Sequence, residues 1–174
     1  MKKIIKITIA VIVLLICTYA VNYVTLKMPA QKQLNEDIRN NGIDFNLHYQ
    51  YFILPKICVF DLQKISSDKA PMDIFRVLLQ TSYALKNREY DTIVLSFRGK
   101  PKFILNGQYF KEIGLEYGIQ NPIYTIRTFP EHLCDVNGNP VYKEWNGGLL
   151  GVLQKQMEDF QDFNKKWYME DIVK

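Results

Sequence analysis

The chain has little of the chemistry on which most metal and redox sites depend. It contains 2 histidines and 3 cysteines in 174 residues, and it has no CxxC or HExxH motif. Structural zinc sites usually need four Cys or His ligands, so no metal site is expected. Glycine-rich phosphate-binding loops and the GxSxG signature of hydrolases are also missing. We therefore predict no metal and no bound cofactor.

Beyond the first residues, the sequence has no long run of charged residues of one sign. The net charge is +4, from 22 Lys and Arg against 18 Asp and Glu, and the basic runs at 98–102 and 164–167 are short. Nucleic-acid-binding domains usually carry a dense basic surface, so no nucleic-acid partner is expected. Apolar residues make up 48% of the chain and aromatic residues 13%, which is typical of a folded protein rather than a disordered one.

A long uncharged stretch stands at the beginning. Three lysines occur among the first six residues, and no charged residue then appears from Ile7 to Leu26. Twenty helical residues span about 30 Å, the thickness of a bilayer core, so residues 4–26 are predicted to contact a membrane. The basic start predicts a single pass through an inner or plasma membrane, with the N-terminus inside and the domain outside the cytoplasm.

Two other interpretations of this segment stay open. An apolar region at 7–16 followed by the sequence Thr-Tyr-Ala at 18–20 is also typical of a cleaved signal, which would leave a secreted or periplasmic protein. Cys17 could instead be the lipidated residue of a lipoprotein, although Ile16 stands where a small residue is preferred. We favour the anchor, because the uncharged stretch is long enough to span.

The rest of the chain predicts one domain behind a spacer. We assign 1–27 to the anchor or signal, 28–43 to a polar spacer and 44–174 to an exported domain. Apolar alternation and helical spacing give the order β-β-α-β-β-α-β-α. The predicted strands are 44–54, 57–65, 91–98, 102–105 and 122–129, and the predicted helices are 66–90, 106–118 and 149–168.

This order is typical of an α+β fold. It predicts a two-layer domain with a mostly antiparallel sheet of about five strands and helices on one face. In the first strand, the residues predicted to share the buried face are Phe45, Leu47, Tyr49, Tyr51 and Ile53. In the last helix, the stripe predicted to pack on the sheet is Leu150, Leu153, Met157, Phe160 and Trp167.

Two groupings of polar residues are candidate sites. Asp61, Arg98 and Arg127 each fall late in a predicted strand, so they could line a pocket for an anionic ligand if those strand ends converge. His132 and Cys134 have the residue types of a general base and a thiol nucleophile. Both candidates compete with ordinary structural roles for the same residues.

The cysteines leave one further question open. Export to an oxidising compartment would permit a disulfide between Cys58 and Cys134, whereas burial as free thiols is the common alternative.

Taken together, these features predict a membrane-anchored extracytoplasmic protein that acts as a non-catalytic binding or scaffold module of the cell envelope, with a protein partner. The alternatives are a small envelope hydrolase and a periplasmic ligand-binding protein.

Overall fold

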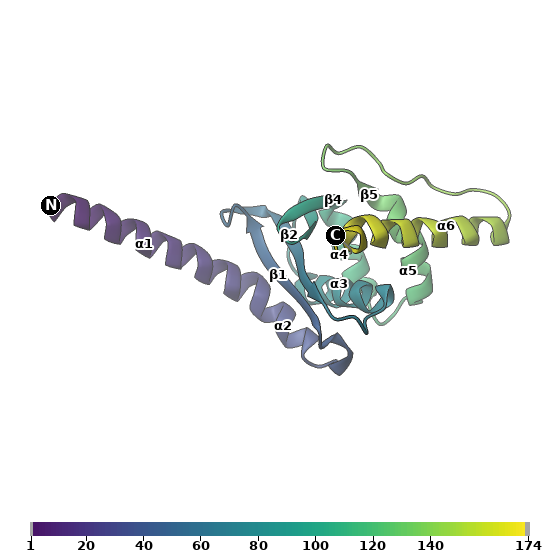
Figure 1. Cartoon of the computed structure of the whole chain (residues 1–174), viewed down its shortest axis with the longest axis horizontal. Helices are drawn as coiled ribbons and strands as arrows, with labels where there is room; N and C mark the ends of the chain where they lie inside the picture. The colour runs from purple at the N-terminus through teal and green to yellow at the C-terminus, as the bar shows by residue number, and fades with distance from the viewer. Residues whose placement is uncertain (1, 173–174) are drawn as a thin grey trace.

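Helical backbone continues without a break from the apolar N-terminal run into the polar segment that follows. The computed structural model describes residues 2–172. The first elements are α1 (Lys2–Asn22), a π-helical turn η1 (Tyr23–Lys27) and α2 (Met28–Leu34). We predicted a spacer at 28–43, but Ala30 and Leu34 are buried in the core. This segment therefore packs with the domain, and the N-terminal helix joins it directly (Figure 1).

The first part of the long helix is exposed on all sides. The helix Lys2–Leu34 is long and apolar enough to cross a membrane, and none of its most apolar window is buried. Burial begins at Asn22, which is 3% exposed, and continues at Leu26, which is fully buried. The prediction of an N-terminal apolar helix of membrane-spanning length is confirmed.

Five strands form one sheet in chain order. They are β1 (Ile43–Gln50), β2 (Leu54–Ile65), β3 (Thr92–Phe97), β4 (Lys100–Asn106) and β5 (Leu133–Cys134). Within residues 2–172, three neighbouring pairs are antiparallel and β2 runs parallel to β3. A parallel pair needs a crossover, which helix α3 (Pro71–Leu85) supplies. The predicted α+β fold with a mostly antiparallel sheet is confirmed.

The helices pack on one face of this sheet. Phe60, Leu95 and Leu105 point to that face from three strands and are fully buried. Trp167, which follows the last long helix, lies on Phe60 with ring centroids 5.9 Å apart. Besides α3, the helical elements of the domain are η2 (Ile38–Asn40), α4 (Gly107–Glu116), α5 (Pro122–Thr128), η3 (Phe129–His132), α6 (Leu149–Asn164), η4 (Lys165–Met169) and α7 (Glu170–Ile172).

The β1–β2 hairpin turns earlier than the sequence pattern predicts. We predicted that Tyr51 and Ile53 continue the buried face of the first strand, but β1 ends at Gln50 and both side chains are exposed. Hairpin turns are usually marked by Gly or Asn, whereas this turn is made of apolar residues. Alternation of apolar side chains cannot reveal a turn whose own residues are apolar.

The segment predicted as the fifth strand is helical. Residues 122–128 form α5, and the side chain of Asn121 caps it by accepting a hydrogen bond from the N–H of Ile123. Pro122 occupies the first turn, where its fixed φ suits a helix. These start signals outweigh the strand preference of the β-branched residues, and β5 takes the fifth place in the sheet instead.

Only the C-terminal half of the predicted stripe on the last helix reaches the core. Phe160 and Trp167 are buried as predicted, whereas Leu150 and Leu153 are exposed. The reason is that the first turns of α6 extend beyond the sheet (Figure 1). Phe163, which the stripe did not include, is fully buried and stacks on Trp167 at 5.2 Å.

Candidate binding groove

A groove lies along the line where the N-terminal helix meets strand β1. It consists of two cavities of about 590 and 290 Å³, and Lys27 of the helix and Asn46 of the strand line both. Val77 of α3 lines the larger cavity, and Tyr19 and Tyr23 line the smaller one. The groove therefore runs from the apolar part of the helix toward the end of α2.

Strand β1 presents an unpaired edge to this groove. Within the described residues β1 is an edge strand that pairs with β2 alone. The N–H of Tyr49 points away from β2, because it donates to Oδ1 of Asn22 at 2.6 Å. The backbone N–H and C=O groups of successive residues point to opposite sides of a strand. Those of Leu47 and Phe45 therefore point away from β2, as the N–H of Tyr49 does. Outside the β1–β2 ladder, no hydrogen bond between described residues reaches these groups.

Side-chain amides dominate the lining of the larger cavity. Its amide residues are Gln31, Asn35, Asn40, Asn41, Asn46 and Gln63, and its charged residues among those described are Lys27 and Asp44. An amide side chain donates and accepts hydrogen bonds at once, as a peptide group does. The lining therefore suits a neutral polar ligand better than a strongly charged one.

Asn22 joins the helix to the strand at the apolar end of the groove. Its Nδ2 donates to the carbonyl oxygens of Phe52 and Thr18, at 2.9 and 2.8 Å, while its Oδ1 accepts the N–H of Tyr49. The hydroxyl of Tyr49 also donates to Oγ1 of Thr25 at 3.0 Å. A buried amide costs free energy unless its groups are paired, and here both its oxygen and its nitrogen are paired.

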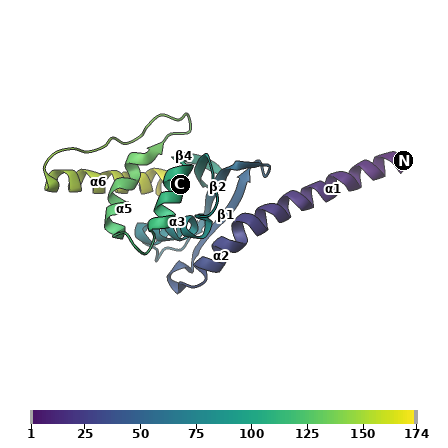
Figure 2. The same cartoon turned by 180° about the vertical axis from the view of Figure 1, so that it is seen from behind.

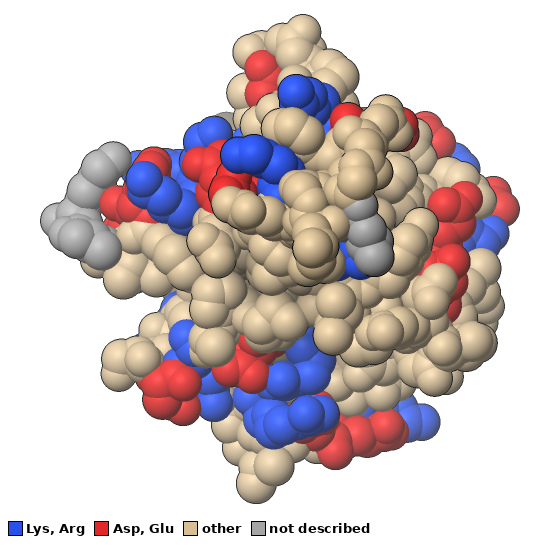
Figure 3. Space-filling view, turned by 90° about the vertical axis from the view of Figure 1, so that its right-hand side faces the viewer, with Lys and Arg blue, Asp and Glu red and all other residues tan. Residues whose placement is uncertain are grey.

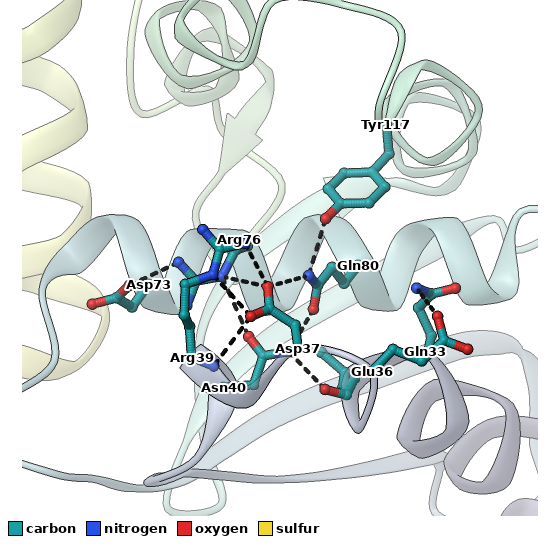
Figure 4. A network of polar contacts seen from close by, with 10 residues as sticks. Gln33, Glu36, Asp37, Arg39, Asn40, Asp73, Arg76, Gln80 and Tyr117 are labelled. Carbon is teal, nitrogen blue, oxygen red and sulfur yellow. Dashed lines mark hydrogen bonds and ion pairs between the residues drawn. The ribbon is translucent and has the colours of Figure 1, made fainter.

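A polar cluster fixes the far end of the helix to α3 (Figure 4). Asp37, which follows α2, accepts hydrogen bonds from Nε and Nη2 of Arg39 at 2.8 and 2.7 Å, and from Nε2 of Gln80 at 3.1 Å. Arg76 of α3 lies 3.5 Å from the same carboxylate and pairs with Asp73 at 2.8 Å. The cluster holds the helical wall of the groove in place.

Gln80 is the centre of this cluster and is 3% exposed. Its Oε1 accepts a hydrogen bond from Nδ2 of Asn40 at 2.6 Å, and its Nε2 also donates to the hydroxyl of Tyr117 at 3.0 Å. Nδ2 of Asn40 donates in addition to the carbonyl of Leu34, at 2.9 Å. The side-chain amides of Asn40 and Gln80 therefore connect Leu34, the last residue of α2, to α3 and to Tyr117 at the end of α4.

The electrostatics of the cluster depend on Asp37. Hydrogen bonds from the Arg39 side chain hold the pKa of this carboxyl well below its ordinary value of 3.8, against the opposing effect of partial burial. The backbone N–H of Arg39 and the amide of Gln80 favour the anion further. Asp37 is therefore charged at neutral pH, and its charge stabilises the cluster.

Asp61, the first predicted ligand-binding residue, lies on the sheet face opposite the helices and is 5% exposed. Its carboxylate accepts the N–H of Gly99 at 2.9 Å and Nε2 of Gln63 at 2.5 Å, so it fixes the turn between β3 and β4. Arg98 belongs to the same turn. Its guanidinium donates to the carbonyl of Gln63 at 3.3 Å.

Arg127 lies elsewhere, because its segment is helix α5 and not a strand. Its Nε donates to Oε1 of Gln156 on α6 at 2.9 Å. The structure thus brings Asp61 and Arg98 to one end of the sheet and leaves Arg127 outside that group. Both arginines bond neutral oxygens, and no described contact joins either of them to Asp61.

His132 and Cys134 are close in sequence but differ in environment. The imidazole of His132 stacks on Tyr109 with centroids 3.6 Å apart, and partial burial lowers its pKa. Cys134 is half-buried in β5, and no hydrogen bond between the described residues links it to His132. Asp135 is occupied by the following turn, since it accepts the N–H of Asn139 at 2.9 Å.

Cys58 and Cys134 are free thiols. They lie in β2 and β5, three strand spacings apart, which corresponds to about 14 Å. A disulfide requires Cα atoms within about 7 Å, so this fold separates the two thiols too far for a bond. Burial raises the pKa of the Cys58 thiol to about 12, which makes it inert. Among residues 2–172, no group of three or more His, Cys, Asp or Glu could hold a metal ion.

The residues of the groove carry no catalytic signature, so the sequence did not point to it. One signal was available: Asn22 is an amide inside a long apolar run, where an unpaired polar group is costly. The other was the spacing of Leu26, Ala30 and Leu34, which is the i, i+4, i+8 spacing of a helix with one buried side.

The end of the domain that carries α5 and the start of α6 has mixed charge. Figure 3 shows acidic and basic side chains interspersed on this face, without a broad area of one sign.

No family model, curated protein or solved structure matches the chain. Function is therefore inferred from the groove, the apolar helix and their contacts.

Proposed function

We propose that the protein is a membrane-anchored, non-catalytic binding module of the cell envelope, whose groove binds an extended segment of a partner protein by strand addition. One observation carries this proposal: β1 is an edge strand among the described residues, and its alternation turns the N–H and C=O groups of Phe45 and Leu47 toward the groove, away from β2. An added strand would satisfy those groups with its own backbone.

The apolar helix supports the membrane part of the proposal. Its exposed first part would lie in the bilayer, and its buried last turns, at Ala30 and Leu34, belong to the domain core. A domain held in this way stays within a short distance of the membrane, which raises its effective concentration toward partners on the same surface.

The charges beside the helix favour one orientation. Lys2, Lys3 and Lys6 precede the apolar stretch, so the N-terminus would stay inside and the domain would lie outside the cytoplasm. Cleavage after Ala20 would instead release the domain as a secreted or periplasmic protein with Asn22 near its new start. The intact mass of the protein purified from membranes distinguishes the two outcomes, because an anchor retains residues 1–20.

The length of β1 along the groove fits a short strand. The stretch from Ile43 to Leu47 extends about 16 Å at the usual rise per residue, which is enough for an added strand of about five residues. The amides that line the larger cavity could bond the other side of that strand. Main-chain bonds would supply affinity, and the cavities would select side chains.

Binding by strand addition can be tested with the full-length chain in nanodiscs. Peptides selected from a display library are bound to the protein, and amide hydrogen exchange is measured with and without peptide. We expect slower exchange at Phe45 and Leu47, and weaker binding by peptides that are N-methylated at alternate residues. Protection of neither amide by any bound peptide would contradict strand addition.

Blocking variants make the same test specific to the groove. Gln31 lines the larger cavity and is exposed, so Gln31→Trp should obstruct it without disturbing the core. Gln154→Trp is a matched control, since Gln154 is exposed on α6 and does not line the groove. We expect at least a tenfold loss of peptide affinity for the first variant and none for the second.

A small polar ligand is the second candidate, because the larger cavity of about 590 Å³ lies in the size range of small-molecule sites. This version corresponds to a periplasmic ligand-binding protein. Such a ligand would be displaced by Gln31→Trp as well, but N-methylation of peptides would then have no bearing on binding. Native mass spectrometry of the purified protein would detect a bound small molecule directly.

A further inference from the structure

The tip of the β1–β2 hairpin is apolar and exposed. Its residues Tyr51, Phe52, Ile53 and Leu54 follow one another, with exposed fractions of 74, 46, 64 and 40%. Single exposed apolar residues are common on protein surfaces. Four consecutive ones at a projecting turn are not, and they indicate contact with something apolar.

The backbone of this turn is left-handed at two positions that hold aromatic residues. Tyr51 and Phe52 have φ angles of 52° and 64°, in the left-handed region that Gly and Asn usually occupy in a two-residue hairpin turn. Glycine or asparagine would therefore fold this turn with less strain. Stability of the domain does not explain two exposed aromatic residues here, so a role in contact is the better explanation.

The position of the tip relative to the apolar helix identifies the contact. Asn22 fixes the carbonyl of Phe52 at 2.9 Å, so the tip lies level with residue 22 of the helix. That is four residues, or about 6 Å, inside the end of the uncharged stretch at Leu26. In Figures 1 and 2 the hairpin tip is the part of the domain that reaches farthest toward the N-terminus of α1.

Aromatic side chains gather at this level. Tyr19 and Tyr23 stack along the helix with centroids 6.5 Å apart, and Phe52 stacks on His48 at 4.8 Å. All four line the smaller cavity of the groove. Aromatic rings with a polar edge favour the boundary between lipid headgroups and acyl chains.

We propose that the hairpin tip, Tyr51–Leu54, inserts into the interfacial layer of the bilayer as a second membrane contact beside the helix. This inference rests on the helix being the membrane anchor of the proposed function. Amphipathic elements at membrane surfaces enter to a depth of about 5–10 Å, which matches the level set by Asn22. Two contacts fix the tilt and rotation of the domain, so the groove keeps a constant direction relative to the membrane.

Depth-dependent fluorescence quenching tests this inference in the intact chain. The protein is placed in nanodiscs whose lipids carry bromine on the acyl chains close to the headgroup. Three single variants are compared with the parent: Phe52→Trp at the tip, Tyr19→Trp in the helix and Ile119→Trp as an exposed apolar control that is 86% exposed near α5. Trp145 and Trp167 give the same background in all four.

Bromolipids are expected to quench the added emission of Phe52→Trp and Tyr19→Trp, but not that of Ile119→Trp. Quenching of Tyr19→Trp without quenching of Phe52→Trp would overturn the tip proposal and leave the anchor intact. Absence of quenching in all variants would overturn the anchor as well. Far-UV circular dichroism of each variant verifies that the fold is retained.

Discussion

Asn22 donates a hydrogen bond from its side chain to the backbone carbonyl of Phe52, 30 residues further along the chain, at 2.9 Å. The same amide accepts the N–H of Tyr49 at 2.6 Å. One buried polar side chain therefore holds an apolar helix and an apolar hairpin tip at a common level. Through this contact, the depth of the helix in a membrane also sets the depth of the tip.

Replacement of this amide should loosen the junction. Asn22→Leu keeps the side-chain size but leaves the Tyr49 N–H and the Phe52 carbonyl without their partner, which costs about 1–3 kcal/mol. Amide exchange at Tyr49 should then become about tenfold faster or more. Thr8→Val is the control, because its hydroxyl bonds only Ile4 within the same helix. Equal exchange rates in the Asn22→Leu variant and the parent would show that the amide does not hold the hairpin.

Stability should depend on pH through Asp37. Hydrogen bonds from Arg39 lower its folded pKa below 3.8, so its contribution is complete at pH values above that and is lost as pH falls through the folded pKa. Urea denaturation in detergent should show lower stability at pH 3 than at pH 7. Asp37→Asn should reduce stability at pH 7 by about 1–3 kcal/mol and flatten the pH dependence.

The matched control for Asp37 is Asp44→Asn. Asp44 is exposed in β1 and its side chain makes no hydrogen bond or ion pair among the described contacts, so its replacement should change stability by less than about 0.5 kcal/mol. An equal loss for the two variants would mean that net charge, and not the cluster, explains the effect.

The sequence predicted those elements whose periodicity coincides with burial. Helix α3 is the clearest example: it lies within the helix predicted at 66–90, and Ile74, Phe75, Leu78 and Leu85, which recur at helical spacing, are all buried. Helix α4 is a second example: it lies within the helix predicted at 106–118, and the side chain of Asn106 accepts the N–H groups of its first turn. In these cases local signals and tertiary packing agree.

The errors arose where local signals conflict. The β-branched residues of α5 favour a strand, but the cap at Asn121 and the proline after it start a helix, which packs Ile126 into the core. The groove could not be predicted at all. It depends on the position of α2 beside β1, which the distant contacts of Asn22 and Gln80 determine.

Two glycines in helices should respond to alanine in opposite ways. A Cβ on Gly114 of α4 would lie 2.6 Å from the backbone oxygen of Ser82 on α3, so Gly114→Ala must push the helices apart. Gly151 of α6 has open space around it, so Gly151→Ala gains helix propensity without a clash. We expect the first to destabilise the chain by about 1–3 kcal/mol and the second to stabilise it by about 0.5–1 kcal/mol. Stabilisation by both would mean that α3 and α4 do not approach so closely.

The cysteines should differ in reactivity without any reduction step. Burial raises the pKa of the Cys58 thiol to about 12, so almost no thiolate forms at pH 8, whereas Cys134 is partly exposed. We expect iodoacetamide to modify Cys134 in the native protein and Cys58 only in urea. Cys134→Ser should lower the native mass shift by one label, and Cys58→Ala should leave it unchanged. If either thiol reacts only after reduction, the two form a disulfide, and the separation of β2 from β5 in this fold is wrong.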